Sequence, residues 1–343
     1  MVASFFFLER CIRTIKPSML KQKIRVVNSL TVKDFFEKHK DALHLTVVGE
    51  EVGFDRQFSE PAPNRPGLAL SGFLTYFAPK RIQVIGNSEV SYLIQMEPEV
   101  RRQRMHELCD QNFPALVIAR NRRVPADVLE VLAERKVPVF KTPLLTMKCL
   151  NMMTYNLQKD FASGTSLHGC MLDYRGIGVL IVGKSGVGKS ETALGLLERG
   201  AALVADDLVR VKQLGKELIT ECTELSKGFI EMRGIGIINV SNLYGLGAIR
   251  PRKRLDLVVE LKPASDLNNV DRLGMNRKTV QIIEREVPLI EIPVAPGRDT
   301  ARLVAVACLD MQLRNLGYDM ADEFNKRLLT QMEAQSSQPP VRF

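Results

Sequence analysis

The chain has 343 residues, of which 45% are hydrophobic and 25% charged, and its formal net charge is +9. This composition is ordinary for a globular protein with two domains. No apolar run is long enough for a membrane span, and the scattered cysteines contain no C-x-x-C pair. We therefore expect a cytoplasmic protein with reduced thiols, no membrane partner and no structural zinc site.

The basic excess is concentrated in three places, namely the first 25 residues, 120–123 and 250–254. A basic balance is compatible with nucleic-acid binding. However, no aromatic residues interleave with these clusters, and no helix-turn-helix or RNA-binding signature is present. We therefore expect no nucleic-acid partner and interpret the clusters as solvated surface and phosphate-handling groups.

The first half of the chain predicts alternating strands and helices. Residues 1–18 are interpreted as an extension before the fold and are expected to be disordered. Strands are predicted at 45–48, 82–85, 115–119 and 137–140. Helices are predicted at 31–40 with Thr31 as N-cap, at 125–135, and from Thr142-Pro143 to about residue 161. This alternation indicates a small α/β domain over 19–154.

The second half is organised around the segment 183–190, which fits G-x-x-x-x-G-K-[ST], the phosphate loop of nucleotide-using enzymes. An apolar strand is predicted before it at 177–182, and a helix after it that ends near Gly200. Backbone N–H groups of such a loop and the helix N-terminus bind phosphate oxygens. Lys189 would reach the β- and γ-phosphates of ATP, and the Ser190 hydroxyl would coordinate Mg²⁺.

Acidic residues follow the next predicted strand. The run 203–205 ends in Asp206 and Asp207, and carboxyl ends of neighbouring strands face the ligand crevice of an α/β sheet. One carboxylate would bind the metal through water, and the other would accept a proton from an attacking hydroxyl. His168, just upstream of the phosphate-loop strand, would orient a carboxylate, contact phosphate or have a structural role.

Three further segments carry charged residues beside glycines. In 230–239, Glu231 is a candidate Mg²⁺ ligand, and Arg233 could pair with phosphate or with Glu231; the alternative is a strand-loop-strand with a surface ion pair. Arg272 and Arg298 could stabilise charge on a transferring phosphoryl group or lie in surface loops. The last helix is predicted at 308–329. The second domain is therefore placed at 155–332, and 333–343 is expected to be a disordered tail.

Taken together, these segments resemble the HPr kinase/phosphorylase family, whose members act on a serine of the phosphocarrier protein HPr. The matching text comprises 166–169, GKSGVGKSETAL at 183–194, LVADD at 203–207, IEMRGIGIINV at 230–240, DRLG at 271–274 and PVAPGR at 293–298. The resemblance covers roughly residues 20–330. It implies an α/β fold with a small N-terminal α/β domain and a C-terminal P-loop kinase domain.

The resemblance also assigns roles to residues. It implies an ATP-binding loop made of Gly183, Lys184, Ser185, Gly186, Val187, Gly188, Lys189 and Ser190. It implies Mg²⁺ at Ser190 and Glu231, and active-site positions at His168, Lys189, Asp206, Asp207 and Arg272. One segment matches a region that the family ties to both activities, namely Ile230, Glu231, Met232, Arg233, Gly234, Ile235, Gly236, Ile237, Ile238 and Asn239. A second segment matches a region tied to dephosphorylation, namely Pro293, Val294, Ala295, Pro296, Gly297 and Arg298. Asp207 would be the proton acceptor in phosphorylation and the donor in the reverse reaction, with Asp206 supporting it.

The activity implied by the resemblance runs in two directions. ATP phosphorylates the HPr serine, and inorganic phosphate removes the phosphoryl group as pyrophosphate, which regulates the phosphotransferase system of carbohydrate metabolism. The family forms hexamers, so the same assembly is expected. One departure is Asp299, where the family usually has asparagine after P-G-R. A carboxylate beside Arg298 could weaken phosphate handling in the reverse direction.

Two other functions fit the phosphate loop. A P-loop kinase or NTPase for a small substrate would need a lid or base-recognition element, and neither is evident. An ATP-gated regulatory binding protein would bind ATP without phosphoryl transfer. Such a protein has no need of a proton acceptor such as Asp207.

Overall fold

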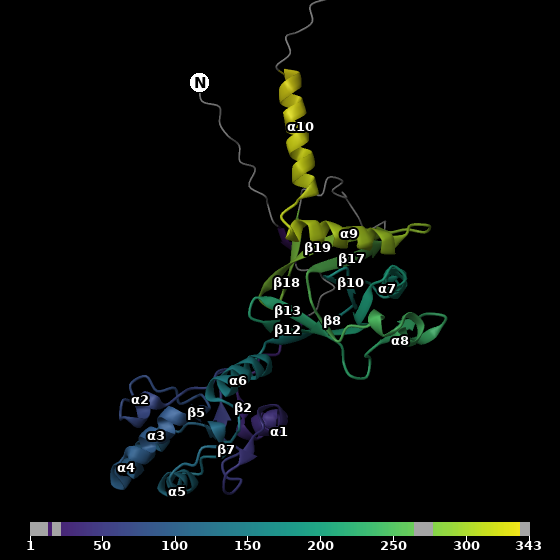
Figure 1. Ribbon diagram of the computed structural model, residues 1–343. Coiled ribbons are helices and arrows are strands. Elements are labelled where there is room, and N and C mark those ends of the chain that lie inside the picture. The colour runs from purple at the N-terminus through teal and green to yellow at the C-terminus, as the bar shows by residue number, and fades with distance from the viewer. Residues whose placement is uncertain (1–12, 16–21, 264–276, 337–343) are drawn as a thin grey trace, which may run out of the picture. The chain divides into compact units, whose positions relative to one another are not determined.

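The computed structural model describes residues 13–15, 22–263 and 277–336 (Figure 1). The chain divides into two compact units. The N-terminal unit comprises residues 26–162, and the C-terminal unit comprises residues 163 onward together with the segment that ends at Arg25. Residue 155, near which the sequence placed the domain boundary, therefore lies inside a helix of the N-terminal unit that ends at Asp160.

The N-terminal unit is built on a four-stranded sheet of order β3-β7-β6-β5. Strands β5, β6 and β7 are parallel, and β3 is antiparallel to β7. One face packs against α2 to α5 and the other against α1 and α6, which gives two apolar cores. The elements are β2 (Leu30–Thr31), α1 (Val32–Leu43), β3 (Thr46–Val47), β4 (Gln57–Phe58), α2 (Gly67–Leu70), β5 (Gln83–Ile85), α3 (Asn87–Gln95), α4 (Pro98–Asp110), β6 (Leu116–Ile118), the 3-10 turn η1 (Ala119–Asn121), α5 (Ala126–Glu134), β7 (Val139–Lys141) and α6 (Thr146–Asp160).

The predicted cap of the first helix is confirmed. The Thr31 hydroxyl accepts the N–H of Asp34 at 3.0 Å, and the Asp34 carboxylate lies 3.4 Å from the N–H of Thr31, which completes a capping box. The predicted start of the last helix of this unit is wrong by several residues. Thr142 is fully buried and donates its hydroxyl to the carbonyl of Leu43 at 2.6 Å, so it does not cap a helix. Helix α6 begins only at Thr146.

The C-terminal unit contains a seven-stranded sheet of order β1-β18-β19-β17-β10-β9-β11. Helices α7 and α9 cover one face (Figure 1). Strand β1 lies in the stretch that the sequence assigned to an extension, and it pairs in parallel with β18. The elements of this layer are β1 (Arg13–Ile15), β9 (Cys170–Tyr174), β10 (Ile177–Gly183), α7 (Lys189–Leu197), β11 (Ala202–Ala205), β17 (Leu257–Pro263), β18 (Lys278–Ile282), β19 (Arg285–Val294) and α9 (Thr300–Asn315). Helix α10 (Met320–Ser336) follows α9.

A second sheet of order β16-β13-β12-β8 contributes Leu167, Val209, Val211 and Leu218 to the core on the opposite face of the large sheet. A two-stranded hairpin, β14-β15, and the short helix α8 complete the unit. The remaining elements are β8 (Gly164–His168), β12 (Leu208–Leu214), β13 (Glu217–Glu221), β14 (Phe229–Met232), β15 (Gly236–Asn239), α8 (Val240–Tyr244), the 3-10 turn η2 (Leu246–Ala248) and β16 (Arg252–Arg254).

The single last helix predicted at 308–329 is wrong, because two helices, α9 and α10, occupy this region. Gly317 has φ of 87°, a left-handed conformation that ends a helix and that glycine adopts without strain. Apolar residues occur on both sides of this break, which is why the sequence pattern alone did not reveal it. Within the described residues, no helix has the length and hydropathy needed to cross a membrane.

Candidate active site

Strands β10, β11, β17 and β19 run in the same direction, so their carboxyl ends lie along one edge of the large sheet. The segments that follow β10, β11 and β19 contain the phosphate loop, the acidic pair and the P-G-R turn, respectively. Ligands of open α/β sheets bind at this edge. The fold therefore places three of the segments singled out by sequence along the same edge.

The phosphate loop joins β10 to α7 through backbone conformations that need glycine. Gly183, Gly186 and Gly188 all have positive φ, and Gly188 is the N-cap of α7. A Cβ on Gly183 would lie 2.7 Å from the carbonyl oxygen of Leu261. The Lys189 ammonium donates to the carbonyls of Gly183 at 3.1 Å and Lys184 at 3.2 Å, which folds its side chain back over the loop.

Asp206 follows directly after β11 and links three segments. Its Oδ2 accepts the backbone N–H of Glu231 at 3.1 Å, and its carboxyl also bonds the thiol of Cys170 on β9. Burial raises the pKa of the Asp206 carboxyl above its usual value, and the hydrogen bonds only partly offset this effect. The Cys170 contact was not predictable from sequence, because Cys170 and Asp206 lie on segments that only the antiparallel pairing of β9 and β11 brings together.

Asp207 is placed differently from its neighbour. Its backbone is left-handed, with φ of 62°, and its side chain is 84% exposed. The Nδ1 of His168, which is 77% exposed, lies 3.6 Å from the Asp207 Oδ1. The N–H of Gly169 donates to the Asp207 carbonyl at 3.0 Å and holds the two segments together. The exposed Asp207–His168 pair is thus open to a substrate, whereas Asp206 is half-buried.

The segment 230–239 forms the hairpin β14-β15, and its turn reaches the phosphate loop. The Arg233 guanidinium donates to the Ser185 hydroxyl at 3.0 Å. A Cβ on Gly186 would lie 3.1 Å from Arg233 Nη1, so the guanidinium lies close to the loop backbone. Together with the bond from the Glu231 N–H to Asp206, this contact connects the hairpin to both the phosphate loop and the acidic pair.

Two predicted elements are not drawn into this cluster. Arg272 lies outside the described residues. Asp299, the residue after the P-G-R turn, makes its contacts away from this cluster: its Oδ2 pairs with Arg199 Nη2, just past the end of α7, at 2.6 Å, and its Oδ1 accepts the N–H of Arg302 at 2.9 Å as the N-cap of α9. The extra carboxylate at Asp299 is therefore already occupied by two donors.

The donor set is suited to a metal ion shared with a nucleotide rather than held by protein alone. Among the described residues, no three His, Cys, Asp or Glu side chains are grouped to hold a metal ion. The Ser190 hydroxyl and the Glu231 carboxylate are hard oxygen donors, and Mg²⁺ is usually bound by one or two carboxylates together with substrate phosphates. The residues thus fit Mg²⁺–ATP, with the phosphates supplying the remaining oxygens.

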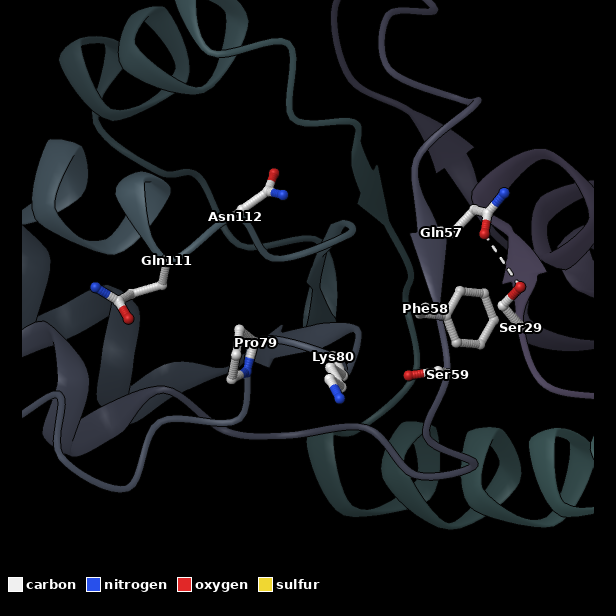
Figure 2. Close-up of a pocket in the computed structure, with 8 residues that line it drawn as sticks. All are labelled: Ser29, Gln57, Phe58, Ser59, Pro79, Lys80, Gln111 and Asn112. Carbon is white, nitrogen blue, oxygen red and sulfur yellow. Dashed lines mark hydrogen bonds between the residues drawn. The ribbon is translucent and has the colours of Figure 1, made fainter.

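A hollow of about 340 Å³ lies elsewhere, within the N-terminal unit (Figure 2). It contains none of the predicted site residues and lies beside residues that precede β5 and β6, at the edge of that sheet opposite the strands' carboxyl ends. Its lining is Ser29, Gln57, Phe58, Ser59, Pro79, Lys80, Gln111 and Asn112. One lysine and neutral polar groups give it no catalytic constellation.

Comparisons with known proteins match both halves of the chain. Residues 159–328 match the family model described as the HPr Serine kinase C-terminal domain, and residues 30–157 match that of the HPr Serine kinase N terminus. An HPr kinase/phosphorylase of Bacillus licheniformis is 39% identical over 302 residues, covering 88% of this chain and 96% of the relative. One of Listeria monocytogenes is 38% identical over 304 residues, covering 88% of this chain and 96% of its own length.

A solved structure, that of the Hpr(Ser) kinase/phosphatase from Coxiella burnetii, is 34% identical. It covers 46% of this chain and 97% of its own, with a TM-score of 0.43. The matches to the curated relatives extend over nearly their whole length. The expected fold, a small N-terminal α/β domain followed by a kinase domain with a phosphate loop, is confirmed, and the chain belongs to the HPr kinase/phosphorylase family.

Proposed function

We propose that this protein uses ATP to phosphorylate a serine of the phosphocarrier protein HPr, and that it removes the phosphoryl group with inorganic phosphate to yield pyrophosphate. The observation that carries the proposal is the joining of three segments at one edge of the sheet. Hairpin β14-β15 contacts the phosphate loop through Arg233 and the acidic pair through Glu231. This arrangement supports a site that holds a triphosphate and a proton acceptor side by side. The enzyme would act in the cytoplasm.

In the forward reaction, backbone N–H groups of the phosphate loop bind the ATP phosphates, and Lys189 exchanges its contacts with loop carbonyls for the β- and γ-phosphates. The exposed Asp207 accepts the proton of the HPr serine as that oxygen attacks the γ-phosphorus in line. His168 orients the Asp207 carboxylate. Most of the rate acceleration would come from positioning and from charge stabilisation.

Asp206 has a positioning role in this scheme. Its carboxyl is half-buried and accepts the backbone N–H of Glu231, so it fixes the hairpin rather than exchanging protons with substrate. The Glu231 carboxylate and the Ser190 hydroxyl would hold Mg²⁺, which neutralises charge developing on the phosphates. Arg233, now on Ser185, lies close enough to the loop to pair with a phosphate oxygen.

In the reverse reaction, inorganic phosphate occupies the position of the leaving group of ATP and attacks the phosphoserine. Asp207 then returns a proton to the serine oxygen as the P–O bond breaks, and the products are serine and pyrophosphate. No covalent enzyme intermediate is required, because the same groups stabilise the same transferring phosphoryl group in both directions. Arg272 and Arg298 are proposed to contribute positive charge to the bound phosphates.

A hexameric assembly is proposed from the family resemblance. Apolar side chains exposed on and after the hairpin support burial in an assembly, since Ile235, Ile237 and Leu246 are 73%, 77% and 85% exposed, respectively. Light scattering after size-exclusion chromatography would report the mass directly. A mass of six chains is expected, and a monomer at micromolar concentration would contradict this part of the proposal.

The function is tested by weighing HPr by intact-mass spectrometry after incubation with the enzyme, ATP and Mg²⁺, and weighing it again after ATP is replaced by phosphate. We expect the gain of one phosphoryl group on serine and its loss with phosphate. Asp207→Asn should lower both rates by at least about 100-fold, the scale of general-base catalysis. Unmodified HPr despite tight ATP binding would contradict the proposal.

A matched control is Glu284→Gln, which also removes one exposed carboxylate. Glu284 lies in the turn between β18 and β19, next to the amino end of β19, which is the edge opposite the candidate site. Both rates should remain unchanged. Equal losses in the two variants would show that net charge, rather than the position of Asp207, determines activity.

A further inference from the structure

The loop after β6 in the N-terminal unit carries a basic cluster that the proposed kinase chemistry does not use. This loop, the arginine loop, comprises Arg120, Asn121, Arg122 and Arg123. Arg120 and Arg123 are exposed and Arg122 is half-buried, with its Nε out of contact with solvent and without a hydrogen-bond partner among the described residues. A buried guanidinium N–H without an acceptor is costly, so the loop is short of anionic partners.

The arginine loop differs from the other basic cluster that the structure describes. In 250–254, Arg250 and Lys253 pair with Asp173, at 3.6 and 3.2 Å, and Arg254 pairs with Asp256 at 2.6 Å. Those three side chains therefore have carboxylate partners within the fold. By contrast, none of the three arginines of the arginine loop has a carboxylate within 4.0 Å among the residues that the structure describes.

The arginine loop lies at the edge of the sheet where α/β proteins bind ligands. It follows the carboxyl end of β6. After β6 the chain continues to α5 on one face of the sheet, whereas after β7 it continues to α6 on the opposite face. Neighbouring strands whose connections diverge in this way define a ligand crevice. The N–H groups of Arg120 and Asn121 donate to the carbonyls of Leu144 and Thr142, at 3.0 and 2.9 Å, which fixes the loop beside the connection from β7 to α6.

The start of α6 adds to the positive potential at this edge. Its N-cap, Leu145, has no side chain that can accept a hydrogen bond, and its first turn contains no acidic residue. The free N–H groups of a 15-residue helix carry partial positive charge. Gly86 also abuts this turn, because a Cβ there would lie 2.2 Å from Thr146 Oγ1. Arginine side chains and helix N–H groups are the two donors that proteins combine for phosphate groups.

We propose that this edge of the N-terminal sheet binds a small phosphate-bearing anion through Arg120, Arg122 and Arg123 together with the first turn of α6. The donors are three arginines within a four-residue segment and one helix end, an extent that suits one or two phosphoryl groups. An extended nucleic-acid backbone would need a longer basic track, with aromatic side chains for the bases. The proposed site is separate from the phosphate loop, which belongs to the other compact unit.

The test is peptide-resolved hydrogen–deuterium exchange of the full-length protein titrated with pyrophosphate, with sodium chloride matched for ionic strength. Because the readout is local, binding at the phosphate loop is recorded on different peptides. We expect slower exchange in 119–123 and 145–149 as pyrophosphate is added. No change in these peptides at pyrophosphate concentrations that saturate the phosphate loop would overturn the proposal.

The decisive variant is R120Q/R122Q/R123Q, which should raise the pyrophosphate concentration for half-maximal protection of these peptides by at least about tenfold, since charge-assisted hydrogen bonds are lost. The control K33Q/R102Q/R135Q removes the same charge from the same unit, at residues paired with carboxylates. It should leave the pyrophosphate concentration for half-maximal protection unchanged. Equal shifts in both variants would overturn the proposal. R123Q alone, at an exposed position, keeps the test valid if the triple variant unfolds.

The same exchange experiment separates a small anion from a macromolecule. A poly-glutamate peptide that protects 119–123 where pyrophosphate does not would overturn the proposal in favour of an acidic protein partner. Protection by pyrophosphate that is retained at 0.15 M salt, on the order of physiological ionic strength, would support a built site rather than diffuse attraction.

Discussion

At Asp299, where the family resemblance led us to expect asparagine, the carboxylate makes two contacts whose loss can be measured. Its carboxylate caps α9 through the N–H of Arg302 at 2.9 Å and pairs with Arg199 at 2.6 Å. Asparagine caps helices about as well as aspartate, so Asp299→Asn should lose only the ion pair. Because the two side chains are 48% and 36% exposed, that pair contributes about 0.2–1 kcal/mol.

Asp299→Ala should lose the cap as well, which costs a further ~1 kcal/mol. For a unit of this size, 1 kcal/mol lowers the midpoint of thermal unfolding by about 2–4 °C. Calorimetry should therefore find the Asn variant within about 4 °C of the parent, and the Ala variant a further ~2–4 °C lower. Adding Arg199→Gln to Asp299→Asn should produce no further loss, since the pair is already broken.

The functional consequence is that Asp299→Asn should leave phosphate-dependent removal of the phosphoryl group from HPr unchanged within about twofold, because Arg199 already neutralises the carboxylate. The rate is measured by intact mass of phosphoserine-HPr against phosphate concentration. A tenfold gain in the reverse rate with an unchanged forward rate would refute this reasoning. That result would mean that Asp299 repels phosphate, as its position beside Arg298 suggested from sequence.

Three further predictions concern single residues. Burial raises the pKa of Asp206, so the stability that it contributes is present below about pH 4 and is lost as pH rises through its folded pKa. Asp206→Asn should therefore flatten the dependence of the unfolding temperature on pH in this range, and it should also lower the kinase rate. An unaltered pH dependence would contradict this. Burial acts to raise the pKa of Asp160, but hydrogen bonds led by that from His39 outweigh it and the pKa is lowered. The Asp160 contribution is therefore present above about pH 4 and lost on acidification, so calorimetry between pH 6 and 3 should find Asp160→Asn less acid-sensitive than the parent. A methyl group at Gly178 would lie 1.8 Å from the carbonyl oxygen of Arg254, so Gly178→Ala should cost about 1–3 kcal/mol or more in thermal unfolding, and an unchanged midpoint would show that the strands separate freely there.

Local features of the fold were predictable from the sequence, because short-range chemistry determines them. The cap at Thr31 and the glycines of the phosphate loop act within a few residues of their own position. The start of α6 was not predictable, because the Thr142 hydroxyl donates to the carbonyl of Leu43, 99 residues earlier in the chain. The division of the last helix at Gly317 was hidden because apolar residues occur on both sides of it.

The candidate site shows the same division between local and long-range information. The order of strand, glycine loop and helix, and the acids after the next strand, indicated phosphate chemistry from sequence. The contacts that tie these parts together join distant residues, as Ser185 with Arg233 and Asp206 with Glu231 do. The neutralisation of Asp299 by Arg199, 100 positions away, also needed the structure. The roles assigned to these side chains stay predictions that the variants above address.

If one site transfers the phosphoryl group in both directions, the group removed from phosphoserine-HPr must be found joined to inorganic phosphate. HPr carrying ³²P-phosphoserine is incubated with the enzyme and unlabelled phosphate, and the products are separated by ion-exchange chromatography. We expect the label to be recovered in pyrophosphate, and Asp207→Asn to lower both this transfer and the forward phosphorylation by at least about 100-fold. Label recovered in inorganic phosphate would indicate hydrolysis by water and would contradict transfer to phosphate at a shared site.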